Sequence, residues 1–279
     1  MFTEASLHIR EARRVKPAEL LAESIARKGN ASWTNESIAA SDGAQLSAWM
    51  FRPERADQAV VLLHGFGDSR RGMQGYAAFF AKHGYAALTP DSRAHGASGG
   101  DLVTFGVRET EDLIRWIAWL RDRGFRRVHA FGASMGGAVV LSATGREGAI
   151  HTAIAECAFA GFHQVAYDGT SGNSGVPRAL LYPLIEPGFI YARVRYGVDL
   201  ASISPLEAVR KTKSPILLIH GTADRTVPVE HGRLLHREGP TTELWEVEGA
   251  RHVRAWNLVP EEYERRVLEW MKRHAPLVY

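Results

Sequence analysis

Residues 128–141 read VHAFGASMGGAVVL, two apolar runs joined by a glycine-rich turn with Ser134 at its apex. The first run predicts a strand and the second predicts a helix. Gly132 and Gly136 flank the serine, as expected where a strained turn brings a strand and a helix into close approach. The pattern is typical of a nucleophile elbow, which presents a serine beside the N-terminus of the following helix.

The pattern G-x-S-x-G occurs a second time, at residues 96–100, where the sequence reads GASGG. A polar stretch precedes it and the segment 101–106 follows it, so neither a strand leads in nor a helix leads out. This context indicates a glycine-rich surface loop, with Ser98 as an ordinary loop residue. Ser134 is therefore the predicted nucleophile.

A serine hydroxyl needs a base within hydrogen-bond reach, and that base is usually a histidine oriented by a carboxylate. Of the 12 histidines, His252 lies in a loop just after the last predicted strand. Asp224 directly follows an apolar strand, whereas Asp168 and Asp199 lie in the stretch 158–200, which is expected to be irregular. Taken singly, Asp224 could be a turn or capping residue and His252 a surface histidine. Their order after Ser134, each in a loop that follows a strand, favours one common site.

Strands and helices alternate along the chain, which predicts an α/β fold with a mostly parallel central sheet covered by helices on both faces. Functional residues are then expected in the loops at the carboxyl ends of the strands. The predicted strands are 46–51, 59–63, 86–89, 127–131, 152–156, 216–220 and 243–247. The predicted helices are 17–28, 74–82, 109–121, the elbow helix, 230–237 and 260–274.

The composition of the 279 residues, 45% of them hydrophobic, suits one domain with an insertion. The net charge is +3 with interspersed signs, so no nucleic-acid partner is expected. Cys157, the only cysteine, excludes an intrachain disulfide and is expected to be a buried apolar side chain. Residues 1–14 lack the apolar core of a secretory signal, and no stretch has transmembrane length. We expect a cytoplasmic protein without stable membrane insertion.

Several segments together resemble the α/β-hydrolase superfamily, specifically its esterase and serine-aminopeptidase-like branch. The matching segments are 62–67 (LLHGFG), 90–96 (PDSRAHG), the elbow, 220–228 (HGTADRTVP) and 249–252 (GARH). The resemblance implies an α/β-hydrolase fold in which Ser134, Asp224 and His252 are catalytic. It also implies an oxyanion hole formed by the backbone N–H groups of Phe66 and Met135.

The resemblance divides the chain into an N-terminal helical appendage (1–30), a hydrolase core (31–157 and 201–279) and a cap or lid insertion (158–200). Aromatic side chains in the insertion are expected to line a substrate pocket, to fill a small core, or both. Residues 169–175 are expected to be its mobile part. Residues 180–198 are amphipathic enough to touch a lipid surface, but their few and mixed charges argue against membrane binding. The aromatic side chains are Phe159, Phe162, Tyr167, Tyr182, Phe189, Tyr191 and Tyr196.

The sequence predicts no metal and no cofactor. Arg70 stands where a dinucleotide fingerprint needs glycine, and residues 67–72 lack the Lys-Ser/Thr of a phosphate loop. No histidine pair has metalloprotease spacing. Glu156, at the end of a strand, is expected to have a structural role. The last strand, 243–247, is expected to form an exposed sheet edge through which copies of the chain could pair as a homo-oligomer.

The predicted activity is hydrolysis of a small-molecule carboxylic ester (EC 3.1.1) through an acyl-enzyme. Amides, peptides or thioesters could use the same groups, and a non-catalytic ligand-binding protein of the same fold is the alternative from another class. A serine rather than an aspartate at position 134 argues against dehalogenase and epoxide-hydrolase chemistry.

Overall fold

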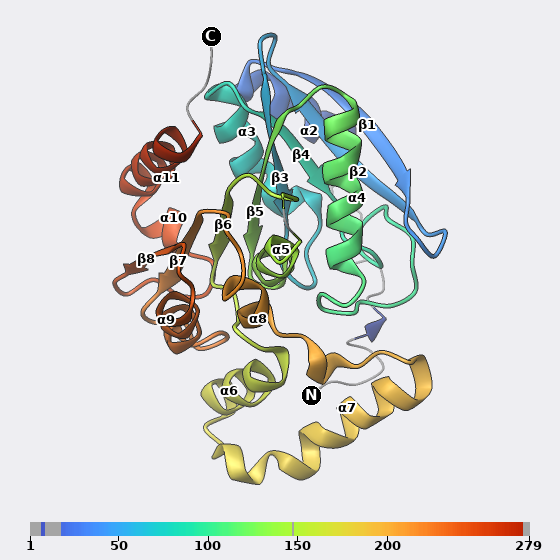
Figure 1. Ribbon diagram of the computed structural model, residues 1–279, viewed down its shortest axis with the longest axis vertical. Coiled ribbons are helices and arrows are strands. Elements are labelled where there is room, and N and C mark those ends of the chain that lie inside the picture. Colours follow the sequence, from blue (N-terminus) through green and yellow to red (C-terminus); the bar gives the residue numbers. More distant parts are fainter. Residues whose placement is uncertain (1–6, 9–17, 147, 276–279) are drawn as a thin grey trace.

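The computed structural model describes residues 7–8, 18–146 and 148–275 (Figure 1). Within them the strands are β1 Ser32–Ala39, β2 Gln45–Arg52, β3 Gln58–Leu63, β4 Ala86–Pro90, β5 Arg127–Ala133, β6 Ala153–Glu156, β7 Ile216–Gly221 and β8 Thr242–Val247. The α-helices are α2 Ala18–Gly29, α3 Gln74–Lys82, α4 Glu109–Asp122, α5 Met135–Thr144, α6 Phe162–Ser174, α7 Tyr182–Tyr196, α8 Pro205–Val209, α9 Val229–Glu238, α10 Ala255–Leu258 and α11 Pro260–His274. Three 3₁₀ turns are η1 Arg70–Met73, η2 Arg178–Leu180 and η3 Leu200–Ser202.

The strands form one sheet in the order β1-β2-β4-β3-β5-β6-β7-β8. β2 runs antiparallel to both of its neighbours, and the pairs from β4 to β8 are all parallel. The predicted mostly parallel sheet is thus confirmed. Its register sets Leu63 beside Gly132 and Ala133 beside Glu156, so the carboxyl ends of β3, β5 and β6 meet at one edge.

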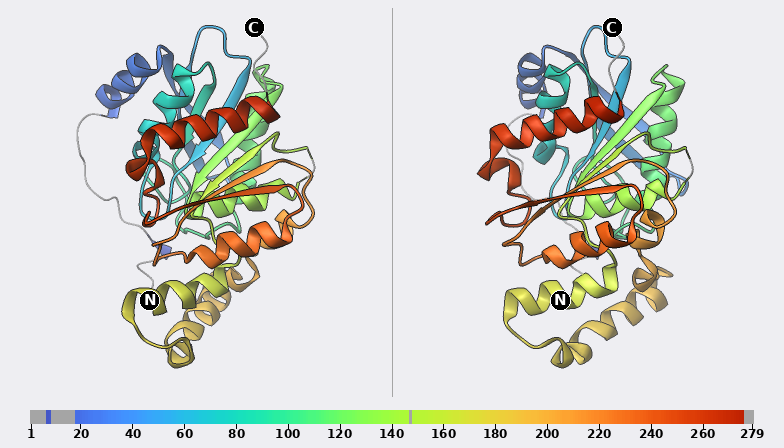
Figure 2. Two further views of the ribbon diagram at one scale, coloured as in Figure 1. Left: turned by 90° about the vertical axis from the view of Figure 1, so that its left-hand side faces the viewer. Right: turned by 60° about the vertical axis from the view of Figure 1, so that its left-hand side comes forward.

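Helices cover both faces of the sheet because the central strands are buried on both sides. Val61 and Leu63 of β3 pack into a core with α4, α5, α8 and α9. Val60 and Leu62 of the same strand point to the other face and pack with α2, α3 and α11. Helix α2 of the N-terminal segment belongs to this second layer, since its Ile25 is buried there with residues of α3. Figure 2 shows the two layers on either side of the twisted sheet.

The expectation that 158–200 is largely irregular is wrong, because the segment contains α6 and α7. These two helices stand beyond the carboxyl end of the sheet (Figures 1 and 2). They share a separate apolar core with the loop 102–105 and with Leu7. The expected mobile part is also helical: residues 169–174 belong to α6, and Gly175 ends it in the left-handed conformation at φ 73°. The domain boundaries drawn from the sequence remain a prediction.

One strand, β1, escaped prediction because its sequence SWTNESIA contains no apolar run. It is mostly exposed and forms the edge beside β2. β8 forms the opposite edge, as expected. Charged pairs lie along that edge, including Arg233 with Glu246 at 2.7 Å and Arg273 with Glu243 at 3.1 Å. No helix in the described part of the chain combines the length and the apolarity needed to cross a bilayer.

Candidate active site

Ser134 occupies the sharp turn between β5 and α5, with backbone angles φ 54° and ψ −117° that residues with a side chain rarely adopt. Its backbone N–H donates to the carbonyl of Glu156 at 2.8 Å. The flanking glycines are sterically required: a Cβ at Gly132 would lie 2.2 Å from the carbonyl oxygen of Gly136, and a Cβ at Gly136 would lie 2.4 Å from that of Leu63. The backbone of residues 132–136 therefore has the tight strand–turn–helix geometry that the sequence predicts for a nucleophile elbow.

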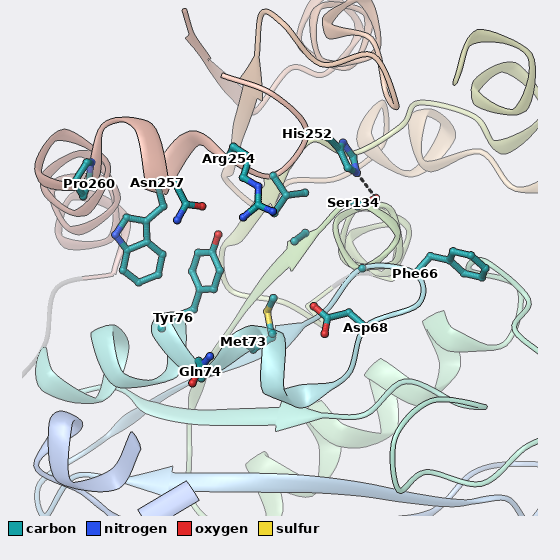
Figure 3. A pocket seen from close by; sticks show the side chains of 16 residues that line it. Phe66, Asp68, Met73, Gln74, Tyr76, Ser134, His252, Arg254, Asn257 and Pro260 are labelled. Atoms are coloured by element: carbon teal, nitrogen blue, oxygen red, sulfur yellow. Dashed lines mark hydrogen bonds between the residues drawn. The ribbon is translucent and has the colours of Figure 1, made fainter. Parts of the chain in front are cut away.

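The structure brings Ser134, His252 and Asp224 together although 118 residues separate the first two. His252 Nε2 lies 2.9 Å from the hydroxyl of Ser134, and its Nδ1 lies 2.7 Å from Asp224 Oδ2 (Figure 3 shows the first contact). An ionised carboxylate can only accept, so Nδ1 carries the proton and Nε2 is left as an acceptor for the serine hydroxyl. In this tautomer His252 can take a proton from Ser134.

Asp224 is held as an anion by the loop that follows β7. Its Oδ1 accepts from the backbone N–H groups of Thr226 at 2.8 Å and Val227 at 2.9 Å. Burial alone would raise the pKa of the Asp224 carboxyl, but the hydrogen bond from His252 and those two backbone N–H groups outweigh it and hold the pKa below its usual value. The carboxylate therefore stays charged near neutral pH and can stabilise a protonated His252.

The oxyanion hole expected from the backbone N–H groups of Phe66 and Met135 remains a prediction, and two contacts of the backbone bear on it. Met135 is the first residue of α5, and the first hydrogen bond of that helix is made three residues later, from Ala138 N–H to the carbonyl of Ser134. The N–H of Met135 is thus among those that a helix leaves unpaired at its N-terminus. The turn containing Phe66 lies close by, since a Cβ at Gly65 would be 3.3 Å from Ser134 Cβ.

Two buried histidines support that turn, and the sequence analysis did not assign them this role. His64 Nδ1 donates to the carbonyl of Gly65 at 2.8 Å, and its Nε2 accepts from Ser92 N–H at 3.0 Å. His95 Nε2 accepts from Gly67 N–H at 3.3 Å. Burial, with His95 nearby, lowers the pKa of His64 to about 4. Both rings are neutral and join the loops after β3 and β4. Their positions in the motifs HGFG and SRAHG are the sequence features that could have indicated this supporting role.

Glu156 is fully buried beneath the site, at the end of β6. Its Oε2 accepts from the hydroxyls of Tyr76 and Tyr263, each at 2.9 Å. The two tyrosines come from α3 and α11, so a single carboxyl group ties together three elements around the site. Burial raises the pKa of Glu156 in spite of these hydrogen bonds. The expected structural role fits these contacts.

A pocket of about 780 Å³ opens beside Ser134 and His252 (Figure 3). Its wall mixes aromatic and polar side chains, a composition suited to a small organic molecule. Arg254 and Asp68 place opposite charges in this wall from two different loops. The labelled side chains in its lining are Phe66, Asp68, Met73, Gln74, Tyr76, Ser134, His252, Arg254, Asn257 and Pro260.

No residue of 158–200 lines this pocket, so the expectation that its aromatic side chains do so fails for this cavity. Most of the aromatic side chains of 158–200 instead belong to the apolar core formed with α6 and α7. Filling a small core was the second role that the sequence left open for them. Phe162 stacks on Phe105 at 4.5 Å between ring centroids, and Phe105 stacks on Phe66 at 5.0 Å. The cap core thus reaches the exposed side chain of Phe66 at the edge of the site.

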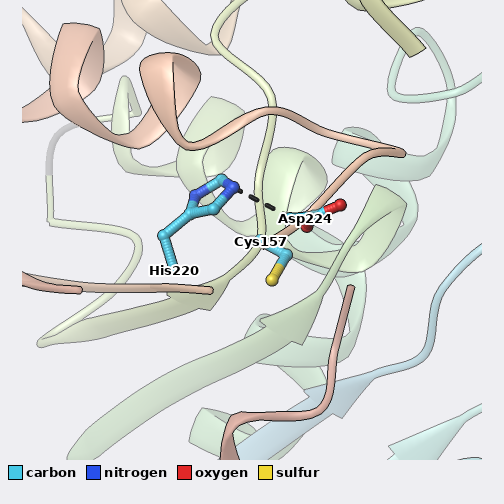
Figure 4. A group of neighbouring side chains, drawn as sticks. All are labelled: Cys157, His220 and Asp224. Atoms are coloured by element: carbon cyan, nitrogen blue, oxygen red, sulfur yellow. Dashed lines mark ion pairs between the residues drawn. The ribbon is translucent and has the colours of Figure 1, made fainter. Parts of the chain in front are cut away.

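Cys157, His220 and Asp224 gather within 4.8 Å of one another (Figure 4). Their polar atoms already have partners. His220 Nε2 donates to the carbonyl of Val227 at 2.8 Å, the Cys157 sulfur accepts from Val253 N–H at 3.4 Å, and both oxygens of Asp224 are engaged as described above. Burial raises the pKa of the Cys157 thiol well above its usual value. His220 Nε2 also lies 3.7 Å from Asp224 Oδ2, the contact marked in Figure 4, so these buried side chains pack around Asp224 with their polar atoms directed to protein partners.

The competing candidates lie elsewhere. Ser98 is in a loop, where its hydroxyl donates to the carbonyl of Asp91 at 2.7 Å and accepts from Ser47 N–H at 2.9 Å. Asp168 is on α6 and pairs with Arg178 at 2.5 Å. Neither residue is part of the hydrogen-bonded chain that contains His252.

Comparison with known proteins agrees with this architecture. Residues 60–266 match the model of the alpha/beta hydrolase family, and the chain belongs to that family. An esterase of Pyrococcus furiosus, Pf2001, superposes with a TM-score of 0.76 over 96% of this chain and 98% of its own, at 27% identity.

Two curated bacterial relatives carry names that state no activity. YqkD of Bacillus subtilis is 27% identical over 239 residues, which cover 82% of this chain and 76% of YqkD. YfhR of Escherichia coli K12 is 28% identical over 215 residues, which cover 73% of this chain and 68% of YfhR.

Proposed function

We propose that this chain is a serine hydrolase that cleaves carboxylic esters through an acyl-enzyme. The observation that carries the proposal is the continuous hydrogen-bonded chain from Ser134 through His252 to Asp224, at the end of a pocket of about 780 Å³. The likeness to the Pyrococcus esterase supports esters as the substrate class.

In the acylation step the Ser134 hydroxyl oxygen bonds to the ester carbonyl carbon while its proton passes to His252 Nε2. The carbonyl oxygen becomes an oxyanion, which the N–H groups of Phe66 and Met135 stabilise, each such donor being worth ~3 kcal/mol. The carbon–oxygen bond of the ester then breaks, and the leaving alkoxide takes the proton from His252. Asp224 stabilises the charged imidazole throughout this step.

Deacylation repeats the same proton transfers with water as the nucleophile. Water gives a proton to His252 and its oxygen bonds to the acyl carbon. The Ser134–acyl bond then breaks, Ser134 recovers the proton from His252, and a carboxylic acid leaves. The net reaction consumes one water and yields an acid and an alcohol.

The first test is hydrolysis of p-nitrophenyl esters of increasing chain length by the wild-type chain and by Ser134→Ala. We expect kcat of the variant to fall roughly 10³-fold or more, because the residues of a catalytic triad act as a unit and removing one of them abolishes most of the rate enhancement. A serine-reactive phosphonate should label Ser134, as read by mass spectrometry of the peptides.

Ser98→Ala is the matched control, since it removes the serine from the second G-x-S-x-G. It should keep its activity per folded molecule. Ester turnover that survives in Ser134→Ala would contradict the proposal. Labelling of Ser134 without ester turnover would favour amides, peptides or thioesters as substrates. The absence of both labelling and turnover would favour a ligand-binding role.

A further inference from the structure

Helix α7 is apolar on its inner and its outer side. Ile185, Phe189 and Ala192 share one face at helical spacing and are buried in the core of the cap. On the opposite face Ile190 is 61% exposed and Val194 is 81% exposed. A surface helix normally turns a polar face outward, and a helix that is apolar all round is normally covered.

Exposed apolar side chains concentrate on this one element. The described part of the chain has eleven large apolar residues that are exposed, and six of them lie in η2, α7 or the connection between them. Scattered exposed apolar residues need no explanation, but a contiguous group marks an interaction surface. We call this group the cap patch: Leu180, Tyr182, Leu184, Ile190, Tyr191 and Val194.

The two exposed charged residues of α7 are both basic. Arg193 and Arg195 are exposed on α7 beside the patch, and Arg195 lies over the ring of Tyr196 at 5.0 Å, not against a carboxylate. The one acidic residue of α7, Glu186, is turned toward α6, where it contacts His163 at 2.8 Å and Tyr167 at 2.6 Å. An apolar centre with a basic margin complements an anionic lipid surface.

A second copy of the chain fits this surface less well. Two-fold pairing through α7 would bring the same patch of each copy together, and α7 offers no outward carboxylate to pair with Arg193 and Arg195 of the other copy, because Glu186 contacts α6. Anionic headgroups would instead neutralise these arginines. The two exposed tyrosines also suit a membrane interface, where their rings lie in the apolar zone and their hydroxyls remain in water.

We propose that the cap patch binds the surface of anionic lipid bilayers, with the outer face of α7 lying in the headgroup region. The binding is peripheral and does not involve a membrane-spanning segment. The sequence predicts no membrane binding by 180–198 because its charges are mixed. The proposal departs from that expectation because Glu186 contacts α6 and leaves the exposed charges of α7 basic. It does not rest on the proposed catalytic function, because Ser134 is not part of the surface.

The test is co-sedimentation of the full chain with vesicles of phosphatidylcholine alone or of phosphatidylcholine with phosphatidylglycerol. We expect preferential binding to the anionic vesicles, weakened by salt. The double variant Ile190→Glu/Val194→Glu should lower the affinity at least roughly tenfold, because it puts acidic groups on the inserted face. Arg193→Ala and Arg195→Ala should each lower it roughly fivefold.

Leu20→Glu is the matched control: Leu20 is 58% exposed on α2, far from the cap in sequence, and this variant should bind as the wild type does. Circular dichroism melting of each variant shows that it is folded. Three results would overturn the proposal. These are no binding to either vesicle, equal binding to both vesicle types, or a dimer in light scattering that only the cap double variant converts to monomer.

Discussion

Glu156 illustrates how much a single buried residue can influence this fold. Its carboxyl group joins α3, α11 and the end of β6, and burial raises its pKa above the usual 4.5. A carboxyl whose pKa is higher in the folded state stabilises the fold below the unfolded pKa, and that contribution is lost as the pH rises through the folded pKa. The wild-type protein is therefore expected to lose stability above about pH 4.5 through this group.

Glu156→Gln removes this titration while keeping the size of the side chain. The free energy of unfolding of the variant minus that of the wild type should increase between pH 5 and pH 8, because only the wild type loses stability through this carboxyl as the pH rises. Urea denaturation at the two pH values measures the change. A difference between variant and wild type that is the same at both pH values would show that the carboxyl does not titrate with folding.

At the scale of elements, α6 packs closely on the loop that carries Asp224. A Cβ at Gly169 would lie 2.5 Å from the carbonyl oxygen of Thr226, and one at Gly172 would lie 2.9 Å from that of Arg225. These glycines therefore serve close packing between the cap and the acid loop, whereas the sequence suggested that they make a mobile loop. Any change that separates α6 from this loop also disturbs the N–H groups that hold Asp224.

Gly169→Ala should destabilise the protein by about 1–3 kcal/mol through this overpacking, although alanine favours a helix by about 1 kcal/mol. It should also lower kcat/KM for esters and increase hydrogen exchange at residues 224–227. Gly161→Ala is the control, because its Cβ would meet nothing closer than 3.9 Å. If both variants behave alike, the close approach of α6 has no functional consequence.

At the scale of the whole molecule, the cap presents the proposed lipid surface and the core presents the proposed hydrolytic site. The two should respond separately to substitution. Ser134→Ala should bind anionic vesicles as the wild type does while failing to hydrolyse esters. The cap double variant Ile190→Glu/Val194→Glu should hydrolyse short soluble esters at the wild-type rate and lose rate only on long-chain esters carried in vesicles. Loss of both properties in either variant would show that the two surfaces are coupled.

Most of the fold could be predicted because its signals are local. Alternating apolar runs and turns located the central strands and the helices around them, and glycine spacing located the elbow at Ser134. Segments without a local signal were missed: β1 is polar because it is an exposed edge, and α6 contains glycines that ordinarily break helices. Their structures depend on contacts with distant parts of the chain.

The sequence by itself determined the mostly parallel sheet, the elbow and the order of Ser134, Asp224 and His252 in loops after strands, because each follows from residues adjacent in the chain. Only the tertiary structure decided which groups surround them: the tyrosines on Glu156, the neutral rings of His64 and His95, and the inward turn of Glu186 that leaves a basic margin on α7. These contacts join residues far apart in sequence, and whether a polar group is buried, paired or exposed is a property of packing that no local pattern encodes.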